Sequence, residues 1–153
     1  MGNTFSIPFW NKTYRYVASI KNDNRVKWMQ YQIVRNCQYT NYRVNKFKRY
    51  VSPLCSYCKV EIELISHLYF KCPIVLNFWK EVKSFMSSAG VELSLSENSV
   101  LFGDKKKRPN SIVNLCILWT KHFIWANKFK NTHLSQLGFK AILGNRLKEF
   151  KEL

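Results

Sequence analysis

The chain has 153 residues, of which 46% are hydrophobic and 16% aromatic, with only five glycines and four prolines. A chain of this length and apolar content can bury a moderate core, which excludes disorder as its overall state. Its 25 lysines and arginines against nine acidic residues give a net charge of +16, a balance typical of proteins that bind polyanions.

The positive charge is concentrated towards the two ends of the sequence. Residues 1–54 contain ten lysines and arginines and one aspartate, and residues 105–153 contain eleven lysines and arginines and two glutamates. Residues 55–104 hold four basic and six acidic side chains. We therefore expect contacts with phosphate groups to come mainly from the two basic flanks.

Two short helices are predicted in the first third of the chain. Apolar residues recur through residues 23–37, and Asp23 or Asn24 can cap a helix at its start. Residues 38–53 are less periodic and contain turn-forming side chains, so they favour a short helix followed by a loop.

The clearest amphipathic pattern follows Cys72. Pro73 suits a first helical turn, and apolar residues then recur at intervals of three and four until the segment 87–90 ends the pattern. Residues 91–110 are polar and then basic, which indicates a connector between two parts of the chain.

The remaining residues, 111–153, predict a helical tail. Asn110 or Ser111 can cap a strongly apolar helix that is too polar at its lysines to span a bilayer. A second helical pattern follows, and we expect Gly138 and Gly144 to interrupt it.

Four metal-binding side chains lie within eighteen residues. Cys55, Cys58, His67 and Cys72 form a C-x2-C-x8-H-x4-C array, in which the first two cysteines can turn back on one cation. Three sulfurs and one imidazole complete a tetrahedral zinc site and leave no open position. We therefore expect one structural Zn²⁺ rather than a catalytic one.

Two other interpretations of the cysteines remain open at this point. They could be ordinary buried residues beside a hydrogen-bonded histidine, or they could form disulfides. Five cysteines leave one unpaired, and the start of the chain lacks a secretory signal, which argues against disulfides. Cys37 and Cys116 lie outside the array, and core packing is expected for both.

The expected fold is therefore mainly α, with a small zinc knuckle embedded among helices and a helical C-terminal tail. Residues 1–90 would hold a basic helical segment and the zinc module, residues 91–110 the connector, and residues 111–153 the tail.

A set of short motifs surrounds the cysteines. They are an aromatic-rich helix over residues 28–37, Thr40 with Asn41, Ser52 with Pro53, Glu61 and Glu63, the segment 67–70, Cys72 with Pro73, and Trp79. In this combination, residues 27–79 resemble the zinc-binding region that follows the polymerase in reverse transcriptases of non-LTR retrotransposons of the long-interspersed type. The segment from residue 101 to residue 143 also resembles the helical tail of such polyproteins.

The resemblance implies a noncatalytic, zinc-stabilised module that helps a polymerase grip template RNA or target DNA. RNA or DNA is the expected partner, a reverse-transcriptase core is a further candidate, and no small-molecule substrate is expected. The polymerase of the family needs paired aspartates, whereas this chain has only Asp23 and Asp104, far apart. We therefore expect no enzyme activity, and expect the chain to be a fragment or tail of a reverse-transcriptase-like polyprotein.

Candidate nucleic-acid contacts are the basic and aromatic residues around the knuckle and a second basic run in the connector. Tyr50 and Tyr57 are the candidates for stacking on unpaired bases. The full set is Arg35, Arg43, Lys46, Lys48, Arg49, Tyr50, Tyr57, Lys59, Lys105, Lys106, Lys107 and Arg108.

The same sequence features leave two other functions open. The module could instead be a zinc-stapled protein-interaction domain that docks on a polymerase core or a host protein. An enzyme with Cys37 or Cys116 as nucleophile is the most distant interpretation, because nothing in the sequence brings a base beside either thiol. The expected location is an intracellular, nuclear or cytoplasmic ribonucleoprotein, and a membrane is not expected.

One N-terminal motif is the pattern for a lipid modification. Met1, Gly2 and Ser6 match the pattern for N-myristoylation, a match that chance often produces.

Overall fold

The computed structural model describes residues 5–21, 23–130, 133–134 and 136–151, and this part of the chain is mainly α-helical. It contains no named strand, and one isolated antiparallel bridge pairs Leu54 with Ile62. The elements are α1 (Ile7–Ser19), α2 (Asn24–Val34), α3 (Asn41–Phe47), the π-helical turn η1 (His67–Lys71), α4 (Pro73–Ser88), α5 (Glu97–Phe102), α6 (Ile112–Lys128) and α7 (Gln136–Lys151). The predicted mainly α fold is confirmed.

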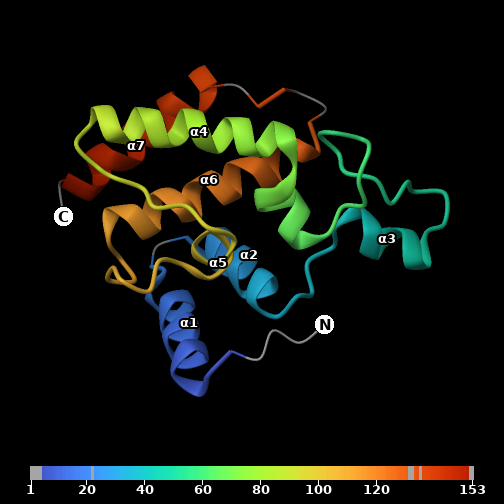
Figure 1. The fold of residues 1–153 in the computed structure, drawn as a ribbon, viewed down its shortest axis with the longest axis horizontal. Coiled ribbons are helices and arrows are strands. Elements are labelled where there is room, and N and C mark those ends of the chain that lie inside the picture. The colour runs from blue at the N-terminus through green and yellow to red at the C-terminus, as the bar shows by residue number, and fades with distance from the viewer. Residues whose placement is uncertain (1–4, 22, 131–132, 135, 152–153) are drawn as a thin grey trace.

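Helix α6 lies at the centre of the arrangement (Figure 1), where it contacts α2, α5, α7 and η1. Three aromatic rings join α6 to its two long neighbours. Phe78 of α4 stacks on Phe123 of α6 with ring centroids 5.6 Å apart, and Phe139 of α7 meets both rings at steep angles. Helix α6 is therefore the element against which the zinc-binding half and the tail both pack.

The predicted helix starts are confirmed by their caps. The Asp23 carboxylate accepts from the Val26 N–H at 3.2 Å, and the Ser111 hydroxyl accepts from the Asn114 N–H at 3.3 Å. Helix α2 ends at Val34, three residues before the predicted end, because the backbone turns into the left-handed region after it, with a φ of 51° at Asn36.

Two helices were not predicted individually. Helix α1 begins after Ser6, whose hydroxyl accepts from the Phe9 N–H at 3.3 Å. Helix α5 lies inside the segment expected to be a polar connector, where Ser96 and Ser99 cap each other reciprocally. The signals were present in the sequence, since a serine at the N-cap is the usual start of a helix.

Helix α7 runs through both glycines that were expected to interrupt it. Its central residues Phe139 and Leu143 are fully buried. Tertiary packing of this face outweighs the roughly 1 kcal/mol that each glycine costs a helix relative to alanine.

One hydrophobic core extends from α1 to α7 and includes residues of η1, α4 and α5. A buried lysine interrupts it: Lys121 of α6 donates to the Gln30 side-chain carbonyl and to the Leu101 backbone carbonyl, and burial lowers the pKa of its amino group. The division of the chain at residues 91–110 stays a prediction.

None of the described helices is both long and apolar enough to cross a membrane. In the myristoylation pattern, Met1 and Gly2 lie outside the described residues, while Ser6 caps α1.

Candidate metal centre

The four predicted ligands converge on one point. The nearest ligand atoms of Cys55, Cys58, His67 and Cys72 all lie within 4.8 Å of one another. The Sγ atoms of Cys55 and Cys72 are 3.9 Å apart, and the Sγ of Cys58 lies 3.3 Å from the Nε2 of His67. Tetrahedral zinc with ordinary bond lengths separates two sulfurs by about 3.8 Å and a sulfur from a nitrogen by about 3.5 Å. The side chains therefore fit zinc with only small adjustments.

The first two ligands are held by a tight turn. The Cys55 N–H donates to the Glu61 carbonyl at 2.8 Å, and the Lys59 N–H donates back to the Cys55 carbonyl at 3.0 Å. The Tyr57 N–H donates to the Cys55 sulfur at 3.4 Å. The hydrogen bond between the Cys55 and Cys72 thiols, together with burial, nevertheless raises the pKa of the Cys55 thiol. The turn closes with Lys59 in the left-handed region, at a φ of 58°.

The other two ligands are brought together by the π-helical turn. In an α-helix, residues five apart point about 140° away from each other. In η1 the Cys72 N–H instead donates to the His67 carbonyl at 2.9 Å, and this wider turn places the two side chains on the same side. Buried Trp79 fixes the turn by donating to the Tyr69 carbonyl at 2.7 Å.

Cys72 also stands at the start of α4. A hydrogen bond from the Cys55 thiol, opposed by burial and aided by the backbone N–H groups of Ile74 and Val75, lowers the pKa of the Cys72 thiol to about 7. The residue is thus placed to supply a thiolate ligand.

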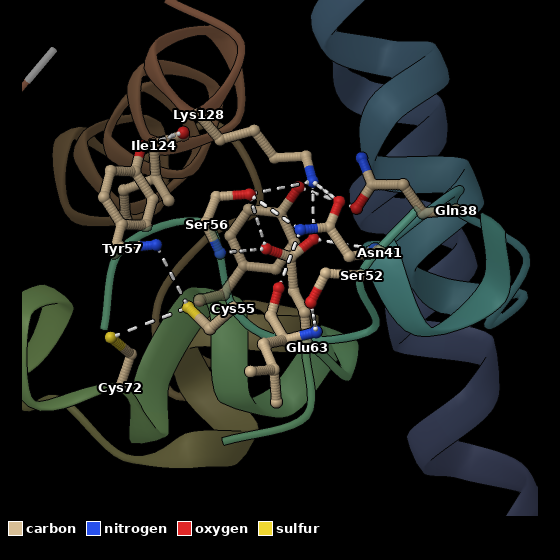
Figure 2. Close-up of polar contacts among 12 residues, drawn as sticks. Gln38, Asn41, Ser52, Cys55, Ser56, Tyr57, Glu63, Cys72, Ile124 and Lys128 are labelled. Carbon is tan, nitrogen blue, oxygen red and sulfur yellow. Dashed lines mark hydrogen bonds and ion pairs between the residues drawn. The ribbon is translucent and has the colours of Figure 1, made fainter. Parts of the chain in front are cut away.

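A buried ion pair connects the cysteine turn to α6 (Figure 2). The Glu63 carboxylate and the Lys128 ammonium group lie 2.5 Å apart, with side chains only 0% and 2% exposed. Glu63 also accepts from the backbone N–H groups of Asn41 at 2.9 Å and Ser56 at 2.8 Å. This one carboxylate therefore joins α3, the cysteine turn and α6.

Tyr57 makes a second connection to α6. Its hydroxyl donates to the Ile124 carbonyl at 2.5 Å, and burial raises the pKa of the phenol. The ring is partly buried against the core, so Tyr57 has a packing role, and its stacking on unpaired bases stays a prediction.

The predicted nucleic-acid contacts fall into separate groups. Five of them gather on α3 and the turn after it: Arg43, Lys46, Lys48, Arg49 and Tyr50. Lys59 is exposed beside the knuckle, and Arg35 is exposed at the end of α2, where Tyr14 hydrogen-bonds it and raises the pKa of its guanidinium group.

The remaining four predicted contacts lie in the loop between α5 and α6, on the other side of the molecule from α3 in Figure 1. Lys106, Lys107 and Arg108 are exposed, whereas Lys105 turns inward and donates to the Phe102 carbonyl. The predicted contacts on α3 therefore lie apart from those in the loop between α5 and α6.

Sequence reasoning did not identify Glu63 and Lys128 as a pair. Glu63 was part of the family pattern, but its partner lies 65 residues away. A lysine inside the apolar pattern of α6 was the available signal, because a lysine on a buried face needs a partner.

Residues 6–79 match the family described as "zinc-binding in reverse transcriptase". Neither a curated protein nor a solved structure matches the chain. The matched span contains all four ligands and ends at Trp79, the residue that anchors the π-helical turn. The matched family is a zinc-binding one rather than a catalytic one, and both it and the ligand geometry fit one structural zinc. Over residues 6–79, the chain is therefore similar to the zinc-binding regions of reverse transcriptases.

Proposed function

We propose that this chain is a noncatalytic nucleic-acid-binding module that helps the reverse transcriptase of a non-LTR retrotransposon hold template RNA or target DNA, within an intracellular ribonucleoprotein. The observation that carries the proposal is a surface on which exposed aromatic rings alternate with cations. We call it the α3 surface, and it comprises Tyr39, Tyr42, Arg43, Lys46, Phe47, Lys48, Arg49 and Tyr50.

The aromatic residues of the α3 surface are unusually exposed. Tyr50 is 83% exposed, and Tyr39 and Phe47 are each 58% exposed, with their rings in an edge-to-face contact. Lys46 lies over the Tyr42 ring at 4.6 Å. Exposed rings beside cations suit single-stranded nucleic acid, since bases stack on the rings while phosphates meet the charges.

The metal centre supports this surface through Asn41, the first residue of α3. The Asn41 side-chain amide donates to the Leu54 carbonyl at 2.8 Å and to the Ser56 hydroxyl at 3.0 Å, both next to Cys55. Zinc would serve to fix this turn and thereby the position of α3. Without the metal, α3 and its surface should therefore lose their fixed position beside the cysteine turn.

The two aspartates of the chain have structural roles, which agrees with a noncatalytic module. Asp23 caps α2 and pairs with Arg146 at 2.9 Å. Asp104 accepts from the Lys106 N–H at 2.9 Å in the loop before α6.

The test is a comparison of two charge-matched double variants. Lys46→Gln with Arg49→Gln removes two cations from the α3 surface, and Lys80→Gln with Lys83→Gln removes two exposed cations from α4. Fluorescence anisotropy of a single-stranded RNA, titrated with zinc-loaded protein over a salt series, gives the affinity and its salt dependence. The first variant should reduce the slope of log K against log salt by roughly 1.4, at about 0.7 for each lost phosphate contact. Equal slopes in the two variants would contradict the proposal.

A second function has one observation in its favour. Trp28 on α2 is 59% exposed and stacks on Tyr31. Such an exposed aromatic pair suits a protein partner such as a polymerase core. If neither RNA nor DNA binds at low salt, this protein-interaction role becomes the preferred one.

A further inference from the structure

A pocket of about 180 Å³ lies between α1 and the loop that joins α5 to α6. Four cations line it, two from each segment: Lys12 and Arg15 on α1, and Lys105 and Lys107 in the loop. Asp104 is the one carboxylate among its lining residues. The cations come from parts of the chain about ninety residues apart, so their convergence was not visible in the sequence.

The loop that forms one wall is held in place by Asn114 of α6. The Asn114 side chain accepts from the Asp104 N–H at 2.7 Å and donates to the Arg108 carbonyl at 2.8 Å. Its backbone carbonyl accepts from the Tyr16 hydroxyl of α1 at 3.2 Å. At Gly103, where φ is 86°, a Cβ atom would lie 3.1 Å from the Tyr16 ring, so the loop approaches α1 this closely because it has a glycine there. The pocket is therefore preformed.

The four cations line one pocket and share it with a single carboxylate, that of Asp104. Among the described residues, none of the four forms a salt bridge. Lys105 donates to the Phe102 carbonyl and lies 4.8 Å from the centre of the Phe9 ring. Burial and the charge of Lys12 lower the pKa of Lys105 to about 8, and Asp104 offsets only part of this. A bound anion would relieve the repulsion.

We propose that this pocket binds a phosphate group of a nucleic-acid strand, as a second point of contact away from the α3 surface. The inference rests on the proposed function for the source of the phosphate, but the pocket itself is independent of the α3 surface. Its volume lies below the 300 Å³ or so at which pockets begin to hold drug-sized molecules, which suits a single phosphate group. The loop half of the pocket lies outside the span that matches the zinc-binding family.

The direct test uses inorganic phosphate and the zinc-loaded full chain. Phosphate titrated into ¹⁵N-labelled protein should shift the amide resonances of residues 103–108 and of α1 before those of α3. Lys12→Gln with Lys107→Gln should weaken this binding about tenfold or more, whereas Lys80→Gln with Lys83→Gln on α4 should leave it within about twofold. Both variants replace exposed side chains, so unchanged thermal unfolding serves as the check that each is folded. Shifts that are weak and spread over all basic segments would overturn the proposal.

The second arm uses the same variants with single-stranded RNA over a salt series. The pocket variant should lower the slope of log K against log salt by roughly 0.7 relative to the α4 control, because one phosphate contact is lost. Wild-type protein that binds RNA together with a pocket variant that matches the control would overturn the inference and leave the proposed function intact. Wild-type protein that binds phosphate in the pocket but no RNA would overturn the nucleic-acid source instead. Pocket-dependent binding to vesicles containing phosphatidylinositol bisphosphate would then assign the phosphate to a lipid.

Discussion

Replacing Lys128 by methionine should strongly destabilise the chain. The substitution keeps the length and apolar stem of the side chain but leaves the Glu63 carboxylate buried without its counter-ion. Breaking a buried ion pair in this way costs about 3–5 kcal/mol. Two backbone N–H groups, from Asn41 and Ser56, continue to bond the carboxylate, so we expect the lower end, about 3 kcal/mol.

The assay is urea and thermal unfolding of the zinc-loaded protein, followed by tryptophan fluorescence. For a chain of this size, about 3 kcal/mol corresponds to a fall in Tm of roughly 6–12 °C. Zinc affinity should fall with stability, because Glu63 bonds the turn that holds Cys55. Lys130→Met, the same chemical change at an exposed position, is the matched control.

A double variant tests the stated cause. Glu63→Gln combined with Lys128→Met removes both charges, so it should recover part of the stability that Lys128→Met loses. If Lys128→Met lies within about 0.5 kcal/mol of the wild type, or if the double variant is less stable than the sum of the two single ones, the buried pair does not stabilise the knuckle as argued.

Three further predictions concern the metal centre and the phosphate pocket. Cys72→Ser should lose the zinc and unfold residues 50–75, as seen by native mass spectrometry and amide hydrogen exchange, and tight retention of one zinc would refute the ligand assignment. Lys59→Gly should raise the free energy of unfolding by about 0.5–1 kcal/mol, because glycine adopts the left-handed conformation without strain, and Lys59→Ala should give no such gain in chemical denaturation. Sulfate, whose charge is constant from pH 7 to 9, should bind the pocket more weakly as the pH rises through about 8, because Lys105 is charged below that pKa and neutral above it. In calorimetric titrations, Lys105→Arg should flatten this dependence, and an unchanged profile would count against Lys105 as its source. The other titratable groups around Lys105 are Lys121, whose pKa the charge of Lys105 lowers, and the pocket-lining residues Lys12, Arg15, Tyr16, Asp104 and Lys107.

Local features were predicted well because their causes are close together in the chain. The caps at Asp23 and Ser111 use side chains within three residues of the groups that they bond. The four zinc ligands were identified from spacing alone, and their convergence in the structure agrees with that prediction. The helices α1 and α5 were missed, although Ser6 and Ser96 carried the same kind of signal.

The sequence by itself determined the mainly helical fold, the ligand set and the excess of positive charge. Only the tertiary structure decided which charges are buried, paired or exposed: Lys128 meets Glu63, Lys105 turns into a pocket with Lys12, and Tyr57 packs on α6. The physical reason is that a hydrogen bond within one turn depends on neighbouring residues, whereas the desolvation of a charge depends on which distant helix faces it. The arrangement of the basic residues into two separate surfaces is therefore a property of the packing around α6.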